Sequence, residues 1–139
     1  MNYLLDTCVI SEFTRRKPDE MVIHWVDSMD EDDLFLCAIT IGEIRRGIDR
    51  LLVSHRKDEL VVWLADGLLE RFTQRVLPLD ATTMFLWGAM TAQLERSGQT
   101  MGLMDSLIAA TAIQNNLILV TRNVSDFVAC GLQIVNPWE

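Results

Sequence analysis

Tyr3-Leu4-Leu5-Asp6, near the start of the chain, is a short apolar run that ends at an acidic residue. Similar runs return along the sequence, and longer segments with a helical spacing of apolar residues separate them. Runs this short do not form independent helices, and their alternation with helices is typical of a parallel sheet. The expected strands are Tyr3–Leu5, Leu34–Ala38, Val76–Leu79, Leu117–Thr121 and Gln133–Val135. The expected helices are Val9–Arg15, Glu20–Met29, Ile41–Leu52, Arg56–Gln74, Thr83–Arg96 and Asp105–Asn115. The sequence therefore predicts an α/β fold around a central parallel β-sheet of about five strands flanked by helices.

The size and composition of the chain predict one domain in a reducing compartment. The 139 residues, half of them apolar, are enough for one compact core, so we expect a single domain over residues 1–139. Cys8, Cys37 and Cys130 are an odd number and form no C-x-x-C pair, which favours neither disulfides nor a zinc site. The first residues lack the pattern of a signal peptide, and no apolar run is long enough to cross a membrane. The expected location is cytoplasmic, with no membrane contact.

The charge of the chain limits how it can bind nucleic acid. A formal net charge of −8 argues against a protein that holds nucleic acid by bulk attraction, because that attraction comes from Lys and Arg at the phosphates. A bound divalent cation or a basic partner protein would have to screen the acids. Basic residues near the expected first helix and on the third either flank such a site and contact phosphates or form an ordinary solvated face. They are Arg15, Arg16, Lys17, Arg45, Arg46 and Arg50.

Four acidic residues follow the expected strands or open a helix between them. Asp6 directly follows the first strand, Glu43 lies in the first expected turn of the helix after the second, and Asp126 lies beyond the fourth. Asp105 opens the helix that leads into the fourth strand. Ligands of open α/β sheets bind beyond the carboxyl ends of the strands, so these four residues form the candidate site.

Each acid must also be weighed against a structural explanation. Acids are favoured in first helical turns, and Thr40–Glu43 has the spacing of a capping box, which leaves the role of that glutamate open between capping and catalysis. Asp126 after Ser125 is open to the same reading as a helix cap. Asp105 is harder to explain in this way, because its helix is apolar almost all round and a buried carboxylate needs a partner. A cation held between Asp105 and a second acid would meet that need.

Converging carboxylates favour a hard divalent cation. Mg²⁺ and Mn²⁺ prefer oxygen ligands and keep several waters. Such an ion polarises a phosphoryl oxygen and acidifies water, which is the core of phosphodiester hydrolysis and needs no side-chain nucleophile. The only histidines, His24 and His55, lie far from the strand ends and are expected in solvent. Thr7 and Thr121 lie beside the acids and are candidates to orient them, although threonine at a strand end is also common without function.

With these residues in place, the chain resembles the PIN-domain ribonucleases, and among them the VapC-type and FitB-like toxins of bacterial toxin-antitoxin pairs. The resemblance spans the whole chain in ordered segments, each of which carries one acid. These segments are Leu4–Glu12, Ile39–Gly47, Asp105–Ala112 and Leu119–Asn123 with Asp126-Phe127. Asn136-Pro137-Trp138, close to the end of the chain, is similar to the FitB-like branch.

The resemblance implies a three-layer PIN-like fold and an endoribonuclease that depends on Mg²⁺ or Mn²⁺. It makes Asp6 and Asp105 the main metal ligands, with Glu43 and Asp126 completing the acidic pocket and helping to position the hydrolytic water. It also implies a homodimer, and a cognate DNA-binding, VapB-like antitoxin that inhibits the RNA-cleaving toxin in a higher assembly. A basic antitoxin peptide in an acidic groove would block metal and RNA together.

The sequence departs from the family pattern at two places. Cys8 stands where many relatives have Asn or another small polar residue, which removes one hydrogen bond near the site. Gly102-Leu103-Met104 precedes Asp105 where a proline is frequent, so this loop has more conformational freedom. Neither departure replaces an acid, and we expect activity to survive both.

Two competing interpretations remain open at this point. A receiver-like phosphoacceptor domain also has acids after parallel strands, and Asp80 could imitate its acceptor, but such a domain needs a lysine where Arg122 stands. A catalytically degenerate PIN-like scaffold would keep its acids only as helix caps. The presence of all four acids argues against that second alternative.

Overall fold

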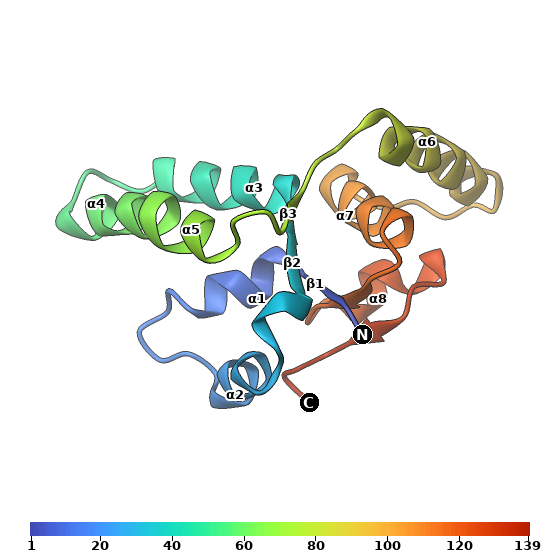
Figure 1. Cartoon of the computed structure of the whole chain (residues 1–139). Coiled ribbons are helices and arrows are strands. Elements are labelled where there is room, and N and C mark those ends of the chain that lie inside the picture. Colours follow the sequence, from blue (N-terminus) through green and yellow to red (C-terminus); the bar gives the residue numbers. More distant parts are fainter.

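A five-stranded sheet forms the centre of the molecule, and all of its strands run parallel. The computed structural model (Figure 1) describes all residues 1–139. The strand order in the sheet is β3-β2-β1-β4-β5. The strands are β1 (Tyr3–Leu5), β2 (Leu34–Cys37), β3 (Val76–Leu77), β4 (Ile118–Val120) and β5 (Ile134–Val135). The predicted strands and their parallel arrangement are confirmed, although all except β1 are one or two residues shorter than expected.

Helices connect the successive strands. They are α1 (Thr7–Glu12), α2 (Glu20–Ser28), α3 (Ala38–Asp49), α4 (His55–Val62), α5 (Leu69–Arg71), α6 (Ala81–Arg96), α7 (Leu103–Gln114) and α8 (Val124–Phe127). Two 3₁₀ turns, η1 (Glu31–Asp33) and η3 (Val128–Cys130), and one π-helical turn, η2 (Trp63–Leu68), accompany them. The longest helix, α6, has 16 residues, and no helix combines the length and the hydrophobicity that a membrane span requires.

Three helices differ from the prediction by three residues or more at one end or both. Helix α3 covers Ala38–Asp49 rather than Ile41–Leu52, because it begins directly after β2. The first helix and the long fourth one differ for local reasons. The first begins at Thr7 rather than Val9, because the carboxylate of Asp6 accepts the Thr7 N–H and caps the helix directly after β1. The helix expected over Arg56–Gln74 is not one regular α-helix. The wide turn η2 interrupts it between α4 and α5, and it ends at Arg71.

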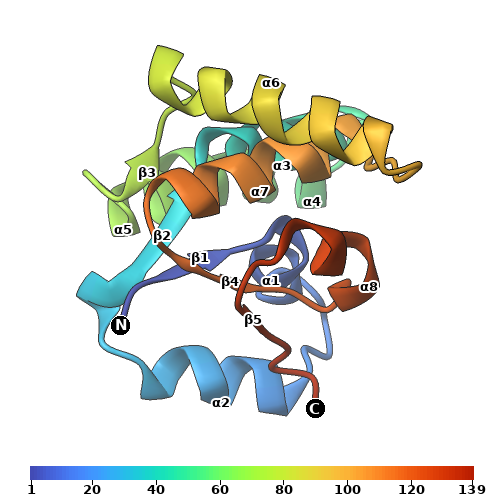
Figure 2. The same cartoon turned by 90° about the vertical axis from the view of Figure 1, so that its right-hand side faces the viewer.

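Alternate residues of the strands face two separate cores. Leu5 and Val120 belong to the core that packs against α1 to α5, whereas their neighbours Leu4 and Leu119 belong to the core that includes α7 and α8. Figure 1 shows this division, with α1 to α5 on one side of the sheet and α6 to α8 on the other. Figure 2 shows that α6 lies outermost, against α7 rather than against the sheet. The predicted sheet with helices on both faces is thus confirmed.

The direction in which strands are added reverses between β1 and β4. From β1 the chain adds β2 and β3 on one side, and it then adds β4 and β5 on the other side of β1. Right-handed crossovers put the helices of these two halves on opposite faces of the sheet. A switch of this kind leaves a crevice beyond the carboxyl ends of the two central strands, where open α/β proteins bind ligands. The first residues at that crevice are Asp6 after β1 and Thr121 after β4.

Candidate active site

The four predicted acids lie at the carboxyl edge of the sheet. Asp6 follows β1, and Asp126 lies in α8, which follows β4. Glu43 lies on α3, which leaves β2, and Asp105 lies in the first turn of α7. Because α7 leads into the parallel strand β4, this helix begins at the edge where the strands end. Four segments that are distant in sequence therefore bring their carboxylates to one side of the molecule.

The carboxylate of Asp6 is buried and held at both oxygens. Asp6 is only 4% exposed; its Oδ1 accepts the Thr7 N–H at 2.8 Å and its Oδ2 accepts the Thr121 hydroxyl at 2.7 Å. Cys8 Sγ lies 3.7 Å from the same Oδ2. Burial raises the pKa of Asp6, and the hydrogen bonds from Thr121 and Thr7 oppose that rise. The structure thus gives Thr121, one of the two predicted orienting threonines, a direct hydrogen bond to an acid.

Glu43 lies in the second turn of its helix and is not a capping residue. The chain passes from β2 straight into α3, which begins at Ala38, so Thr40 lies inside the helix and Cys37 occupies the cap position. The carboxylate of Glu43 instead accepts the Thr7 hydroxyl at 2.6 Å, and Thr40 Oγ1 lies 3.1 Å from that hydroxyl. Both the first-turn placement and the capping-box interpretation are wrong. Thr40 was not predicted as a neighbour of the site, because its spacing from Glu43 imitates a cap.

Asp105 carries a charge that no basic side chain compensates. Burial, together with repulsion from Asp6, Asp126 and Glu43, raises the pKa of Asp105 from 3.8 to about 6. None of the ion pairs in the protein includes one of these four acids. The helix that carries Asp105 is buried over Ser106–Ala112, as its apolar sequence predicted. Like charges are therefore gathered at the start of a buried helix.

Asp126 is the exposed member of the cluster. It lies in the first turn of α8, but Asn123 occupies the cap position of that helix and no side chain caps it. The interpretation of Asp126 as a helix cap is therefore wrong. Its negative charge contributes to the raised pKa of both Asp6 and Asp105, which places it beside them.

The oxygen atoms of these acids fit a hard divalent cation. No three of the His, Cys, Asp and Glu side chains in the protein converge into a ready-made metal cluster. Mg²⁺ does not need such a cluster, because one or two carboxylates usually hold it and several of its waters remain bound. The carboxylates here have no basic partner, and burial together with neighbouring negative charge raises the pKa of one of them. A cation would relieve that repulsion.

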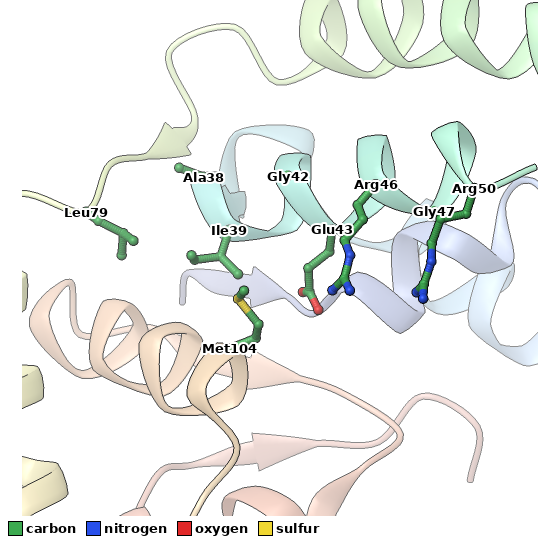
Figure 3. Close-up of a pocket in the computed structure, with 9 residues that line it drawn as sticks. All are labelled: Ala38, Ile39, Gly42, Glu43, Arg46, Gly47, Arg50, Leu79 and Met104. Carbon is green, nitrogen blue, oxygen red and sulfur yellow. The ribbon is translucent and has the colours of Figure 1, made fainter.

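A cavity of about 540 Å³ opens beside Glu43, between α3 and the start of α7 (Figure 3). Arg46 on α3 and Arg50, the C-cap residue directly after this helix, line the cavity. Its apolar lining residues are Ala38, Ile39, Leu79 and Met104. The volume lies within the range of about 300–1,000 Å³ that is usual for ligand sites. The sequence carries no signal for this cavity, because its shape depends on how α3 packs against α7.

Other titratable groups considered from the sequence lie away from the cluster. His55 contacts Glu59 at 3.3 Å on α4, and His24 is exposed on α2, as expected for histidines in solvent. Asp80 caps α6: its Oδ1 accepts the Thr83 N–H at 2.9 Å, and this hydrogen bond lowers the pKa of Asp80. A capping role accounts for Asp80 without a receiver-like acceptor site.

A five-stranded parallel sheet flanked by helices, with acidic residues at the carboxyl edge of the sheet, is what the resemblance to PIN-domain proteins implies. The family model of the PIN domain matches residues 3–127. The chain therefore belongs to the PIN-domain family, and the receiver-like interpretation is wrong.

Individual relatives cover nearly the whole chain. It is 38% identical over 136 residues to VapC ribonuclease Y4jK of Sinorhizobium fredii, with 98% of this chain and 97% of the relative aligned. It is 37% identical over 136 residues to toxin FitB of Neisseria gonorrhoeae, with 98% of each chain aligned. The crystal structure of FitAcB from Neisseria gonorrhoeae is similar at a TM-score of 0.94 and 36% identity over 99% of each chain. The resemblance to VapC-type and FitB-like proteins is thus confirmed.

Proposed function

We propose that this chain is a metal-dependent endoribonuclease that acts as the toxin of a toxin-antitoxin pair. The observation that carries the proposal is the gathering of four carboxylates, without a basic partner, at the switch point of a parallel sheet. The names of two relatives, VapC ribonuclease Y4jK and toxin FitB, support both the activity and the biological role. The substrate we propose is RNA, which is cleaved by hydrolysis of a phosphodiester bond.

Asp6 and Asp105 are the residues that would hold Mg²⁺ or Mn²⁺. When bound, the ion supplies positive charge to a phosphoryl oxygen and acidifies water for attack at phosphorus. Asp6 is suited to this role because the Thr7 N–H and the Thr121 hydroxyl fix both of its oxygens. Asp105, with a pKa raised to about 6, is mostly ionised at neutral pH and gains a counter-charge when a cation is held.

Glu43 and Asp126 would complete the acidic pocket and position the hydrolytic water. The hydroxyl of Thr7 donates to Glu43 at 2.6 Å and so holds one oxygen of this carboxylate in place. Thr7 therefore joins two acids, because its N–H donates to Asp6 and its hydroxyl to Glu43. Asp126 is exposed, and its carboxylate is free to accept a hydrogen bond from water.

The partners that we propose are a second copy of the chain and a cognate antitoxin that is VapB-like and binds DNA. The solved structure of FitAB bound to a DNA fragment, 35% identical to this chain, supports an assembly of this kind. Basic groups of an antitoxin would find unpaired acids at the site. All three cysteines are free, which agrees with the cytoplasmic location that we propose for the toxin.

Cleavage of labelled RNA by the purified chain tests the catalytic proposal. We expect cleavage with Mg²⁺ or Mn²⁺ and none in EDTA. We also expect none in the variants Asp6→Asn and Asp105→Asn, both folded by circular dichroism. Asp80→Asn is the matched control, because it makes the same change at an acid that only caps a helix. Equal cleavage by wild type and both site variants would trace the activity to a contaminant, and a folded wild type that cleaves no RNA would favour the degenerate scaffold.

Expression in a bacterial host tests the toxin role separately. We expect the wild type to arrest growth and Asp105→Asn not to. Co-expression of the protein encoded beside this chain should restore growth and yield a complex that copurifies. Light scattering of the isolated chain then measures whether two copies associate. Growth arrest that the neighbouring protein does not relieve would contradict the pairing but leave the nuclease proposal standing.

A further inference from the structure

The cavity beside Glu43 contains two arginines that form no ion pair within the protein. Arg46 and Arg50 line it, and neither takes part in an ion pair. Arg45, on the same helix, lies outside the cavity, and its Nε donates to Asp49 Oδ2 at 2.8 Å. Helix α3 and its C-cap residue therefore carry one paired arginine and two free ones, and only the free ones line the cavity.

The free arginines continue a row that begins at the acidic cluster. Figure 3 shows Glu43, Arg46 and Arg50 extending from the same side of α3. Their spacing of three and four residues produces this alignment, and the two arginines are about 6 Å apart along the helix axis. Because Glu43 belongs to both the cluster and the cavity, a chain bound at the acids would next pass the two guanidinium groups.

Two glycines leave the wall of the cavity bare between these side chains. Gly42 and Gly47 lie within α3 and line the cavity, and a Cβ at either position would meet nothing within 4 Å. Packing therefore does not require glycine here, although glycine weakens a helix relative to alanine. The bare wall allows a ligand to approach the helix backbone closely.

We propose that this cavity binds the single-stranded RNA segment next to the cleaved bond, an inference that rests on the endoribonuclease function proposed above. Arg46 and Arg50 contact its phosphates, and a base lies against the apolar end of the cavity. A basic peptide would be repelled by both guanidinium groups, and an acidic peptide by Glu43 and the cluster behind it. The phosphates of RNA fit both parts of this surface, because the divalent ion binds them at the acids and the arginines bind them along α3. With a net charge of −8, local groups and not bulk attraction must bind it.

Substitution of single arginines on α3 tests the phosphate contacts. The probe is a short fluorescein-labelled single-stranded RNA of mixed sequence, bound with Mg²⁺ in the Asp105→Asn background so that no cleavage occurs. Arg46→Gln and Arg50→Gln should each weaken binding by about three- to tenfold and lower the slope of log K against log[salt] by about 0.7. Arg45→Gln removes the same charge from the same helix outside the cavity, and it should change affinity less than about twofold.

Substitution of glycine by alanine provides a readout in which stability and binding move in opposite directions. Gly47→Ala should raise the melting temperature by about 2–4 °C, because alanine favours the helix, and should weaken RNA binding several-fold, because its methyl group enters the cavity. Gly88→Ala is the control: Gly88 also lies inside a helix with open space around it, but it does not line the cavity. It should raise the melting temperature and leave RNA binding unchanged.

The outcomes separate this inference from the nuclease proposal. Equal loss of affinity in Arg45→Gln, Arg46→Gln and Arg50→Gln would reduce the effect to general charge and overturn the inference. Unchanged RNA affinity in Arg46→Gln and Arg50→Gln would also overturn the inference. This includes the case in which these two variants lose affinity only for the antitoxin, because the cavity would then be a protein-binding site. If the wild type cleaves RNA in either case, the nuclease proposal stands. RNA binding that follows the expected pattern in a chain that never cleaves would overturn the nuclease proposal alone.

Discussion

Acidic side chains have basic partners at one edge of the sheet and none at the other. At the amino edge, before β2, Glu31 accepts two hydrogen bonds from Arg71, at 2.7 and 3.0 Å, and these bonds lower its pKa. At the carboxyl edge, four acids gather without a basic partner, and the pKa of Asp105 rises to about 6. Paired charges favour the folded state, whereas unpaired like charges oppose it until a cation arrives. The contrast indicates that one edge serves stability and the other serves binding.

The amino edge is a junction between elements that lie far apart in sequence. Arg75 lies 3.5 Å from the carboxylate of Glu31, and it also donates to the Leu34 carbonyl at 2.7 Å. Its guanidinium lies 4.9 Å from the centre of the Phe72 ring. This arrangement ties η1, β2 and the end of α5 together. The acids of the carboxyl edge have only hydroxyl, thiol or backbone donors, which leaves their charge available to a ligand.

The largest effect should come from making the same substitution at each edge. Glu43→Gln should lower RNA cleavage by about 100-fold or more, because glutamine still accepts the Thr7 hydroxyl but carries no negative charge. Its free energy of unfolding should stay within about 0.5 kcal/mol of wild type. Glu31→Gln should do the reverse. It should lower the free energy of unfolding by about 1 kcal/mol, a value limited by solvent screening at this partly exposed pair, and leave cleavage unchanged.

Urea unfolding and initial cleavage rates, measured on the same preparations, give both numbers for both variants. If Glu43→Gln lowers the free energy of unfolding as much as Glu31→Gln does, Glu43 has a structural role and the two edges do not differ. The same conclusion follows if Glu31→Gln lowers the cleavage rate while it remains folded.

Removal of one supporting hydroxyl should have the next largest effect. Thr121→Val keeps the shape of the side chain but deletes the donor to Asp6 Oδ2, and such outer partners are usually worth about 10- to 100-fold in activity or metal affinity. Thr111→Val is the control, since Thr111 is equally buried and its hydroxyl donates to the Leu107 carbonyl within α7. Cleavage rates measured across Mg²⁺ concentrations should show a higher metal requirement in Thr121→Val only. The same shift in Thr111→Val would point to a general loss of packing.

Asp105→Asn should stabilise the folded chain at neutral pH when EDTA removes divalent ions. The pKa of Asp105 is about 6 in the folded protein against an ordinary value of 3.8, so the folded state binds this proton more tightly than the unfolded state. The stability that it provides is present below about pH 4 and is lost as the pH rises to about 6. Above that pH the variant should be more stable than wild type by about 1 kcal/mol, a value reduced for solvent screening of a partly exposed group.

Urea unfolding at a series of pH values checks this sign. The two proteins should have equal stability below about pH 4, and the variant should gain its advantage between about pH 4 and 6. A variant that is less stable than wild type at neutral pH would mean that Asp105 has a favourable partner in the folded chain. The difference between the two edges would then disappear.

The sheet was predictable because buried parallel strands are short apolar runs, and each of the five strands matched one. The starts of helices were less predictable. Asp6 directly follows a strand and also caps the next helix. Thr40–Glu43 has the spacing of a cap but lies inside a helix that begins at Ala38. The wide turn η2 has no counterpart in the periodicity, because Trp63–Leu68 continues the apolar spacing of the helix before it.

The positions of the four acids could be predicted because strand ends converge by topology alone. Their hydrogen-bond partners could not, since those depend on which elements pack together. The hydroxyl of Thr7 reaches Glu43 only because α1 lies against α3. The sequence does not distinguish the free Arg46 and Arg50 from the paired Arg45, because the difference depends on which side of the helix lines the cavity. The roles of the acids came from the family resemblance, and the variants above test them.

The smallest effect should follow removal of the thiol beside the acids. Cys8 Sγ lies 3.7 Å from Asp6 Oδ2 and 3.6 Å from Thr121 Oγ1, and a thiol is a weak donor. Cys8→Ala leaves the Thr7 N–H and the Thr121 hydroxyl on Asp6, so cleavage should change by less than about threefold. The same cleavage assay, run beside Thr121→Val, measures the difference. If Cys8→Ala costs as much as Thr121→Val, the thiol orients Asp6 as strongly as the hydroxyl does, and the carboxyl edge depends on a residue that the family pattern marks as an exception.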